Sequence, residues 1–407
     1  MRLLFLSHYF KPEGNAPASR TYEHCKRWVA AGHEVTVITS CPNVPHGRPY
    51  RGYRNRLVQE EWLDGIRVIR VWTFLAANKG TILRTLNYLS YLFCASVRGI
   101  GMSQFDVVIA TSPQFFCGLA GSIVSSFRRK PFVLEIRDIW PESIEAVGAV
   151  GGRGAIGILA WLEKRMYRSA DHIVCVGDGY RRKLIERGVP VEAISVITNG
   201  ADLSVYAPGA ASESLRERFG LHGKFVIGYV GTLGMACGLD CVLDAAESTN
   251  DVVYLLAGDG ARREELQRMA VERGLSQVVF TGQLEKEEIP ALLRTVDVCL
   301  VHLRDLPLFQ TVLPSKIFEA FATSKPIIVG VHGEASAVVL GAEAGVEIPA
   351  EDAGALVAAV RGLRDDPERA RRMGANGRRV VEAYYNRDAL AARFLEVVDE
   401  QVLNQAV

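Results

Sequence analysis

Several sequence patterns that mark common classes of protein are missing from this chain. Its eight cysteines, spread over 407 residues, form no C-x-x-C pair, which argues against a disulfide scaffold, a zinc ribbon and a thioredoxin-type redox site. There is no D-x-D triplet, and we expect no catalytic metal and no cofactor. No RNP pattern, zinc finger or recognition-helix arm is present, so we expect no nucleic-acid partner.

The chain also lacks an uninterrupted apolar run long enough to suggest a membrane span. Residues 107–127 carry no charge, but the polar run Thr111–Gln114 interrupts them, which favours a strand, a turn and a buried helix. The apolar N-terminal stretch is cut off by His8 and Lys11, and no small-residue cleavage site follows, so we expect no secretory signal.

A net charge of +1 conceals an uneven distribution. Residues 1–190 carry 26 basic and 15 acidic side chains, whereas the remainder of the chain is acidic. Such a split indicates that the first half faces a polyanion, which, without a nucleic-acid motif, favours a membrane surface.

Short apolar runs alternate with helical patterns along most of the chain. In the first half they predict strands over Leu3–Ser7, Glu34–Thr39, Arg67–Trp72, Val107–Ala110, Phe132–Ile136 and His172–Val176. In the second half they predict strands over Phe225–Val230, Val253–Ala257, Val278–Thr281, Val298–Val301 and Pro326–Val329. This alternation predicts an α/β fold with two parallel sheets, each covered on both faces.

A turn-rich connector separates the two series of strands. Asn199-Gly200-Ala201-Asp202, followed by Pro208, places a hinge near 199–208, so we predict two Rossmann-like domains that face a central cleft. The N-terminal domain covers 1–198 and the C-terminal domain covers 199–386. The last segment, 387–407, carries an amphipathic helix that we expect to return to the N-terminal domain.

Two motifs follow strands of the first half, at the end where ligands of open parallel sheets bind. Tyr9–Asn15 contains a glycine that would let backbone N–H groups approach a phosphate, although it lacks G-x-G-x-x-G and a tight turn is the alternative. Glu135–Glu142 places several charged side chains close together, which costs free energy unless they form ion pairs or take part in function. A surface ion pair of Arg137 with Asp138 or Glu142 is the alternative to a functional role.

Three motifs follow strands of the second half. Val230–Gly234 and Ala257–Gly260 are glycine turns whose N–H groups suit a diphosphate, although each could be a mere turn. Pro314-Ser315 predicts a helix start. Lys316 and Glu319 then lie one turn apart near the positive helix end, where a lysine suits a phosphate and a carboxylate can hold vicinal hydroxyls. An ordinary i,i+3 salt bridge is the alternative.

On these motifs the chain resembles bacterial GT-B glycosyltransferases of family 4, which are retaining, sugar-nucleotide-dependent enzymes. The resemblance rests on FLSHYFKPEGNAPASRTYE, EIRDIWPES, VITNGAD, LLAGDG and VLPSKIFEAFATSKPIIV, which cover both halves. The chain is most similar to the branch that includes the N-acetyl-L-fucosamine transferase of O-antigen synthesis and colanic-acid glycosyltransferases.

The resemblance implies roles for individual residues. Glu319 matches the second carboxylate of an E-x7-E element that binds the ribose, and Lys316 matches a residue near the diphosphate and sugar. Asp138 matches a strand-end residue near the transferred sugar and the acceptor, and these three are the catalytic candidates. The other candidates for donor binding are Gly14, Asn15, Gly231, Thr232, Gly258, Gly282, Gln283, Leu284, Leu313, Pro314 and Ser315. The candidates for the acceptor side are Arg137, Asp138 and Glu142.

The sequence also departs from the family pattern. Thr311 occupies the position of the first carboxylate of E-x7-E, and Cys237 stands where many relatives have a lysine. Neutralisation of the diphosphate would then depend on Lys316, the helix end after Pro314, and Arg304.

The resemblance implies transfer of a hexosyl group, an N-acetylated amino sugar, from a UDP-linked donor to an undecaprenyl-diphosphate-linked saccharide in O-antigen or polysaccharide synthesis. Two other functions remain open. A UDP-sugar 2-epimerase of the same fold would need acid/base groups, and none of the eight histidines lies in an evident acid/base cluster. A non-catalytic sugar-binding membrane scaffold is the second.

The basic first half leads to a prediction about location. Lys79–Arg98 is apolar and flanked by basic residues, and Arg128-Arg129-Lys130 adds another basic run. We expect peripheral attachment to anionic lipid on the inner, cytoplasmic face of the membrane. The alternative is that Leu83–Phe93 forms a buried core helix, because its apolar positions do not form one narrow stripe.

Overall fold

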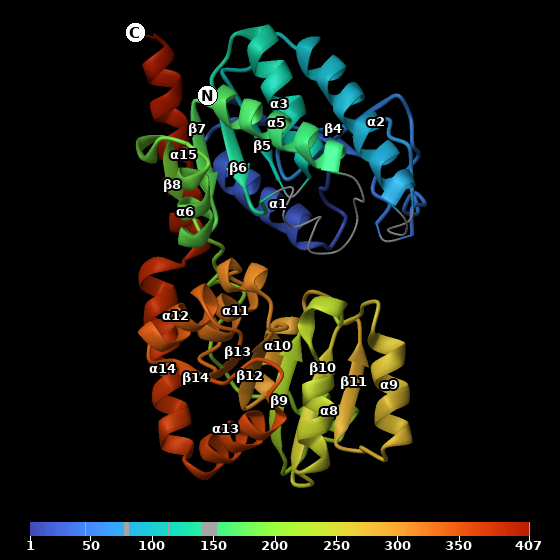
Figure 1. Ribbon diagram of the computed structural model, residues 1–407, viewed down its shortest axis with the longest axis vertical. Helices are drawn as coiled ribbons and strands as arrows, with labels where there is room; N and C mark the ends of the chain where they lie inside the picture. The colour runs from blue at the N-terminus through green and yellow to red at the C-terminus, as the bar shows by residue number, and fades with distance from the viewer. Residues whose placement is uncertain (45, 77–80, 113, 140–152, 407) are drawn as a thin grey trace. The chain divides into compact units, whose positions relative to one another are not determined.

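The computed structural model describes residues 1–44, 46–76, 81–112, 114–139 and 153–406. Contacts divide the chain into two compact units: unit 1 is Met1–Thr198 with Asp388–Val407, and unit 2 is Asn199–Arg387. Each unit contains one largely parallel sheet between helices, as Figure 1 shows. The prediction of an α/β fold with two Rossmann-like halves is confirmed.

The sheet of unit 1 has eight strands. They are β1 (Arg2–Leu6), β2 (Glu34–Ser40), β3 (Val58–Leu63), β4 (Ile66–Val71), β5 (Val107–Thr111), β6 (Phe132–Ile136), β7 (His172–Cys175) and β8 (Ile194–Val196). Their order is β3-β4-β2-β1-β5-β6-β7-β8. β5, β6 and β7 are buried along their whole length, because helices cover both faces of a parallel sheet.

Six described helices cover the sheet of unit 1. They are α1 (Ala16–Ala30), α2 (Thr81–Ile100), α3 (Phe115–Arg128), α5 (Arg153–Ser169), α6 (Asp178–Glu186) and α15 (Arg387–Ala406). α2, α3, α5 and α6 contribute to the core on one face, and α1 and α15 contribute to the core on the other. Trp28 on α1 donates from Nε1 to the carbonyl oxygen of Ala391 on α15 at 2.9 Å, so the C-terminal helix packs on the N-terminal domain as predicted.

The sheet of unit 2 has six strands, all parallel. They are β9 (Phe225–Val230), β10 (Val252–Ala257), β11 (Val278–Gly282), β12 (Val298–His302), β13 (Ile327–Gly330) and β14 (Gly345–Glu347). Their order is β11-β10-β9-β12-β13-β14. The carboxyl ends of β9, β10 and β11 are therefore neighbours at one edge of the sheet.

Eight described helices cover the sheet of unit 2. They are α7 (Glu213–Phe219), α8 (Asp240–Glu247), α9 (Arg263–Glu272), α10 (Ile289–Thr295), α11 (Lys316–Ala322), α12 (Glu334–Gly341), α13 (Ala353–Asp365) and α14 (Pro367–Tyr384). α8, α9 and α13 pack on one face. The others contribute to the core on the opposite face.

Three strands differ from the sequence expectation. β3 is an edge strand that pairs antiparallel with β4, and its residues VQEEWL are half exposed, so no apolar run marked it. β8 and β14 have three residues each, which is too short for a periodic pattern to be recognised. The prediction of a strand and a buried helix within 107–127 is confirmed by β5 and α3. No helix in the described parts of the chain is long and apolar enough to cross a bilayer.

Candidate active site

Two glycines bring the ends of β9 and β10 into close contact. Gly258 has φ 139°, and a Cβ added there would lie 2.0 Å from the carbonyl oxygen of Gly231. The N–H groups of Gly231 and Gly258 donate to the carbonyl oxygens of Ala257 and Gly282, at 2.9 and 3.0 Å. The predicted N–H donors at these two glycines are therefore already used within the sheet edge. Their contribution is the close approach of three strand ends.

Lys316 reaches the same sheet edge from α11. Its Nζ lies 3.7 Å from the centroid of the Tyr229 ring, and a Cβ added to Gly231 would lie 2.8 Å from that Nζ. Burial lowers the pKa of Lys316 to about 8. No ion pair within 4.0 Å joins Lys316 to Glu319 among the described residues, so the alternative of a simple i,i+3 salt bridge is wrong.

Glu319 lies one turn further along α11 in a partly buried, cationic setting. Burial raises the pKa of its carboxyl, and the positive charges of Arg387, Lys316 and Lys286 oppose that shift. Tyr206 forms a side-chain hydrogen bond with the carboxylate. Sequence reasoning missed Tyr206 and Tyr229, because the former lies in the connector and the latter within an apolar strand.

The start of α11 differs in detail from the prediction. Ser315 is the N-cap and makes no side-chain cap hydrogen bond, and Pro314 precedes it outside the helix. Leu313 is buried. α11 has only seven residues, so the positive field of its end is weaker than expected and the Lys316 charge becomes more important.

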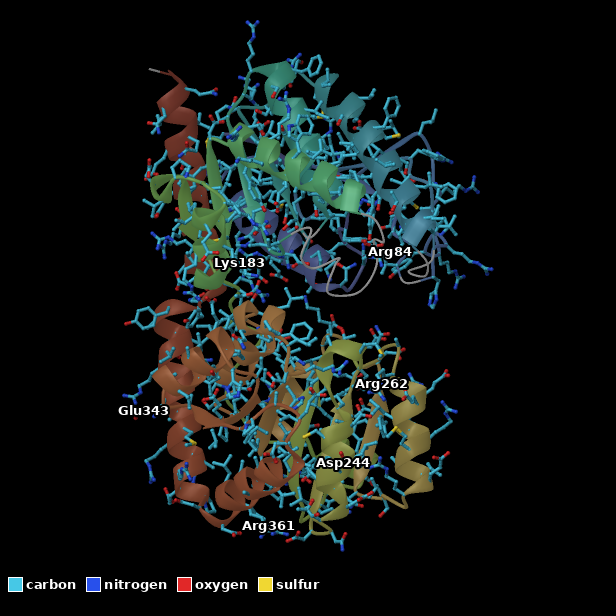
Figure 2. All side chains as sticks on the ribbon, in the orientation of Figure 1. Arg84, Lys183, Asp244, Arg262, Glu343 and Arg361 are labelled. Atoms are coloured by element: carbon cyan, nitrogen blue, oxygen red, sulfur yellow. The ribbon has the colours of Figure 1, made fainter. Side chains whose placement is uncertain are left out.

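The other donor candidates of unit 2 surround this edge. Thr232 accepts a hydrogen bond from the Tyr229 hydroxyl at its carbonyl oxygen, at 2.9 Å. Gln283 is exposed beyond β11, and Leu284 packs partly against the core. Arg262, labelled in Figure 2, donates from its backbone N–H to the carbonyl oxygen of Leu233 at 3.0 Å and so holds the β9 and β10 loops together.

Gly14 and Asn15 lie in unit 1, at the start of α1. Asn15 is the N-cap, and its Oδ1 accepts from the N–H of Ala18 at 2.9 Å. Gly14 is exposed, and a Cβ added there would meet nothing within 4 Å. Glu13 beside them is buried, and its Oε1 accepts from the N–H groups of Asn43 and Val44. The loop is thus anchored on both sides of an exposed glycine.

Arg137 and Asp138 follow β6 in unit 1. Their backbone N–H groups both donate to Oγ of Ser112, at 2.7 and 3.2 Å. Arg137 also donates from Nη1 to the carbonyl oxygen of Pro17 at 3.4 Å. Asp138 lines a small cavity between β6, α3 and α5. Glu142, the third candidate of this motif, lies outside the described residues.

The carboxylate of Glu135 belongs to the charged motif whose burial would cost free energy without partners. Its partner in the structure was missed by sequence reasoning. Arg20 on α1 donates from Nε to Oε1 of Glu135 at 2.7 Å, and Thr111 donates from Oγ1 to Oε2 at 2.5 Å. Arg20 is 8% exposed and Glu135 is fully buried. Arg20 lies 115 residues before Glu135, so no local pattern could connect the two.

Family comparisons agree with this division of the chain. Residues 15–200 match the family model described as glycosyl transferase 4-like domain. Residues 211–380 match the one described as glycosyl transferases group 1. The chain belongs to the GT-B glycosyltransferases. Both matched families are glycosyltransferases, which argues against the epimerase alternative.

Individual relatives of this glycosyltransferase span most of its length. It is 26% identical over 336 residues to the colanic acid biosynthesis glycosyl transferase WcaI of Escherichia coli, covering 79% of this chain and 81% of WcaI. It is 27% identical to a GDP-mannose-dependent alpha-mannosyltransferase of Mycobacterium tuberculosis, covering 81% and 78%. The structure of HepE from Anabaena in complex with UDP-glucose has a TM-score of 0.72 at 18% identity, covering 98% and 100%.

Two positions where this glycosyltransferase departs from the family pattern make local hydrogen bonds. Cys237 is buried and donates from Sγ to the carbonyl oxygen of Thr232 at 3.2 Å. Thr311 closes the 3-10 helix Pro307–Thr311 and donates from Oγ1 to the Leu308 carbonyl oxygen at 3.2 Å. Arg304, the other cation expected to neutralise the diphosphate, donates from its backbone N–H to the carbonyl oxygen of Ala236 at 2.9 Å. Its guanidinium Nε lies 3.5 Å from Oε1 of Glu351, so its charge is paired with a carboxylate.

His8 and His302 are buried, as is typical of structural histidines. Burial lowers the pKa of His8 to about 3. His302 is buried, with Nδ1 2.8 Å from the Cys237 carbonyl oxygen and Nε2 accepting from the N–H of Glu351 at 3.0 Å. Within the described ranges, no group of three His, Cys, Asp or Glu side chains could hold a metal ion.

Proposed function

We propose that this glycosyltransferase moves a hexosyl group, an N-acetylated amino sugar, from a UDP-linked donor to a lipid-linked saccharide with retention of configuration. The observation that carries the proposal is the convergence of Gly231, Gly258 and Lys316 at one sheet edge of unit 2, with Glu319 one turn further along α11. Two glycines that carry no side chain, beside a lysine and with a partly buried carboxylate one turn away, suit a diphosphate joined to a ribose.

Lys316 neutralises the diphosphate in this mechanism. As the bond from the anomeric carbon to the phosphate oxygen breaks, the sugar gains oxocarbenium character and the diphosphate gains negative charge. A preorganised ammonium near that oxygen stabilises the developing charge more strongly than water would. Glu319 holds the ribose hydroxyls, and the departing phosphate oxygen takes the proton of the acceptor hydroxyl.

Asp138 acts from unit 1. Its backbone N–H is held by Ser112 just after the carboxyl end of β6, the end of a parallel sheet at which ligands bind. We assign it to positioning the acceptor hydroxyl or stabilising the reacting sugar. Arg137, which stays cationic although burial lowers its pKa to about 10, supports the same strand end.

Two nucleobases, uracil and guanine, are candidates for the donor. HepE, of the same fold, was solved with UDP-glucose, whereas the M. tuberculosis relative is named as GDP-mannose-dependent. We propose UDP. The test is transfer to a lipid-linked acceptor from UDP-, GDP- and ADP-sugars, with product stereochemistry read by NMR and with EDTA present in one arm. Turnover that requires GDP, inverts the anomeric centre or stops in EDTA would contradict the corresponding part of the proposal.

A lipid-linked acceptor lies at a membrane surface, so the enzyme needs a surface of its own that can bind lipid. Helix α2 has such a surface. Its residues Ile82, Leu86, Leu89, Phe93 and Val97 recur at helical spacing and are 43–78% exposed, and we call them the α2 stripe. The core alternative holds for the opposite face, where Tyr91 and Ala95 are buried. We propose that the α2 stripe inserts into anionic lipid on the cytoplasmic side.

Basic side chains near the α2 stripe favour anionic lipid as its binding partner. α2 packs against α3, whose end carries the exposed Phe127 and the run Arg128-Arg129-Lys130. Arg84, labelled in Figure 2 on α2, lies over the Tyr88 ring. Arg98, which the sequence also assigned to lipid, pairs instead with Glu60 at 2.7 Å. Each basic side chain near anionic lipid contributes about 1 kcal/mol.

A further inference from the structure

Helix α1 holds both points at which the chain passes between the units. The chain leaves unit 1 after Thr198 and re-enters it at Asp388. Arg20 donates from Nη1 to the carbonyl oxygen of Thr198 at 2.8 Å and from Nη2 to that of Ile197 at 2.9 Å. Arg27 donates from Nε to Oδ1 of Asp388 at 2.5 Å. The two arginines are seven residues apart, so they lie on one face of α1.

The first of these crossings is held rigidly. Three nitrogens of the Arg20 guanidinium have partners, because its Nε also binds the buried carboxylate of Glu135. That carboxylate is itself satisfied by Thr111. A planar guanidinium with partners on every side has little freedom to reorient, so the chain exit at Thr198 is fixed to α1 and to β6.

The same network reaches the candidate reacting groups of unit 1. Glu135 lies in β6, three residues before Asp138, and Thr111 is followed by Ser112, which holds the N–H of Asp138. α1 itself starts at Asn15, the cap beside the exposed Gly14. One helix therefore connects the Gly14 loop, the β6 end and both chain crossings.

The two crossing segments are also joined to each other within unit 2. The N–H of Ala201 donates to the Tyr385 carbonyl oxygen, and the N–H of Arg387 donates to that of Ala201, both at 3.0 Å. Arg387 donates from Nη2 to the carbonyl oxygen of Gly200 at 2.8 Å. Its charge acts on Glu319, so the crossing is coupled to the proposed ribose site.

We propose that Arg20 with Glu135, and Arg27 with Asp388, are positioning residues for sugar transfer. By fixing both chain crossings to α1, they limit the arrangements in which the acceptor side of unit 1 can meet the donor held by unit 2. We assign none of the four to substrate contact, because their observed partners all lie within the protein. The inference rests on the proposed function, but its first test does not require turnover.

That first test measures the separation of the units in solution. Probes attached by non-cysteine chemistry at Ser126 on α3 and Val271 on α9, both exposed, report an inter-unit distance distribution by pulsed EPR. Arg20→Lys keeps the charge but cannot reach the carboxylate and both carbonyls. Asp388→Asn removes the second ion pair at a side chain that is 72% exposed, so this variant retains its fold. Both distributions should broaden relative to wild type.

The second test separates positioning from binding. UDP affinity should stay within about twofold in both variants, whereas kcat should fall roughly 10- to 100-fold, the range expected for misplaced reacting groups. Arg67→Ala, which removes an exposed pair with Glu60 in unit 1, is the matched control. Distance distributions and kcat values like those of this control would overturn the proposal, as would a broadened distribution with unchanged kcat. If the wild-type protein transfers no sugar from any donor, the proposed function is wrong. The distance distributions alone then decide whether the two ion pairs fix the arrangement of the units.

Discussion

The ammonium group of Lys316 lies over the ring of Tyr229, 3.7 Å from its centroid, and has no carboxylate within ion-pair distance among the described residues. A partly buried lysine that is stabilised by an aromatic face retains its capacity to bind an anion. This relationship distinguishes the site from a structural salt bridge, because a paired lysine would have to give up its partner before it could hold a diphosphate. It also fixes the direction of several measurable effects.

Donor affinity should depend on pH through Lys316. The pKa of its ammonium is about 8, below the ordinary 10.5, because burial disfavours the charged form. A bound diphosphate favours the charged form and raises this pKa. UDP affinity should therefore fall as pH rises through 8, with proton uptake on binding. Calorimetry in two buffers of different ionisation enthalpy measures both the affinity and the number of protons taken up. A UDP affinity that stays constant from pH 7 to 9.5 would contradict the assignment of Lys316 to the diphosphate.

Removal of this lysine should stabilise the protein while it weakens binding. With a folded-state pKa below the unfolded value, the unfolded state binds more protons between pH 8 and 10.5. The cost to stability is thus full below pH 8 and disappears toward pH 10.5. Lys316→Met should raise the thermal midpoint at pH 7 and lower UDP affinity by about 1.5–3 kcal/mol. A lower midpoint at pH 7 would show that the Tyr229 contact outweighs the burial cost.

Glu319→Gln should remove discrimination at the ribose. The carboxylate accepts hydrogen bonds from vicinal hydroxyls in our proposal, and losing a charged acceptor costs about 1.5–3 kcal/mol. Wild type should bind UDP more tightly than 2′,3′-dideoxy-UDP by this amount, and the variant should bind both equally. Tyr206→Phe, which removes only the tyrosine partner of the carboxylate, is the control. A variant that still prefers UDP would disprove ribose binding by Glu319.

Gly258→Ala should disturb the site far more than Gly274→Ala. A Cβ at 258 would lie 2.0 Å from the Gly231 carbonyl oxygen, whereas one at 274 meets nothing within 4 Å. Gly274→Ala should cost only about 1–2 kcal/mol, because its φ is 68° and L-residues resist that conformation. Urea unfolding and UDP titration should show a larger loss of both stability and affinity for Gly258→Ala. Equal losses would mean that the β9 and β10 ends are not closely held.

Asp138→Asn should lower turnover while nucleotide affinity is preserved. The two side chains have nearly the same shape, and the backbone contact with Ser112 remains. We expect kcat to fall roughly 100-fold, as for loss of a positioned acid/base or charge-stabilising group, with UDP affinity unchanged. Asp171→Asn, at the opposite end of β6, is the control, since Asp171 only accepts from the Phe132 N–H. Weakened UDP binding with full kcat at saturation would disprove the assignment.

The sequence predicted those elements whose residues carry a dense local signal. β5 and β12 contain the continuous apolar runs Val107–Ala110 and Val298–Val301, and they were found because parallel strands are buried on both faces. β3 was not found, because this half-exposed edge strand has three consecutive polar residues, Gln59–Glu61, and no apolar run. The helix over 81–100 was predicted, but its sequence did not distinguish the core face from the exposed face. The structure does so, because it buries Tyr91.

The site was predictable where spacing along one element carried the chemistry. Lys316 and Glu319 were identified because they are one turn apart. Partners from other elements were missed, since the contact of Lys316 with Tyr229 joins α11 to β9 and that of Arg20 with Glu135 joins α1 to β6. Only the tertiary fold brings these residues together, and a single sequence contains no record of that proximity.

The α2 stripe should bind the protein to anionic liposomes. Phe93 and Val97 are 69% and 56% exposed, so Phe93→Ser/Val97→Ser should remove lipid contact with little effect on folding. Flotation should require anionic lipid because Arg84 and the run 128–130 are attracted to it, and recovery should decline with salt as the Debye length shortens.

Two variants separate the apolar from the electrostatic part of this attachment. Arg84→Glu should reduce flotation at low salt and make it less sensitive to added salt, whereas Phe93→Ser/Val97→Ser should reduce it at every salt concentration. Val271→Ser, at an 80% exposed apolar position on α9 in unit 2, should float like wild type. Equal recovery with neutral and anionic liposomes at low salt would reject electrostatic docking. Full recovery of the double serine variant would show that the α2 stripe is not the contact surface.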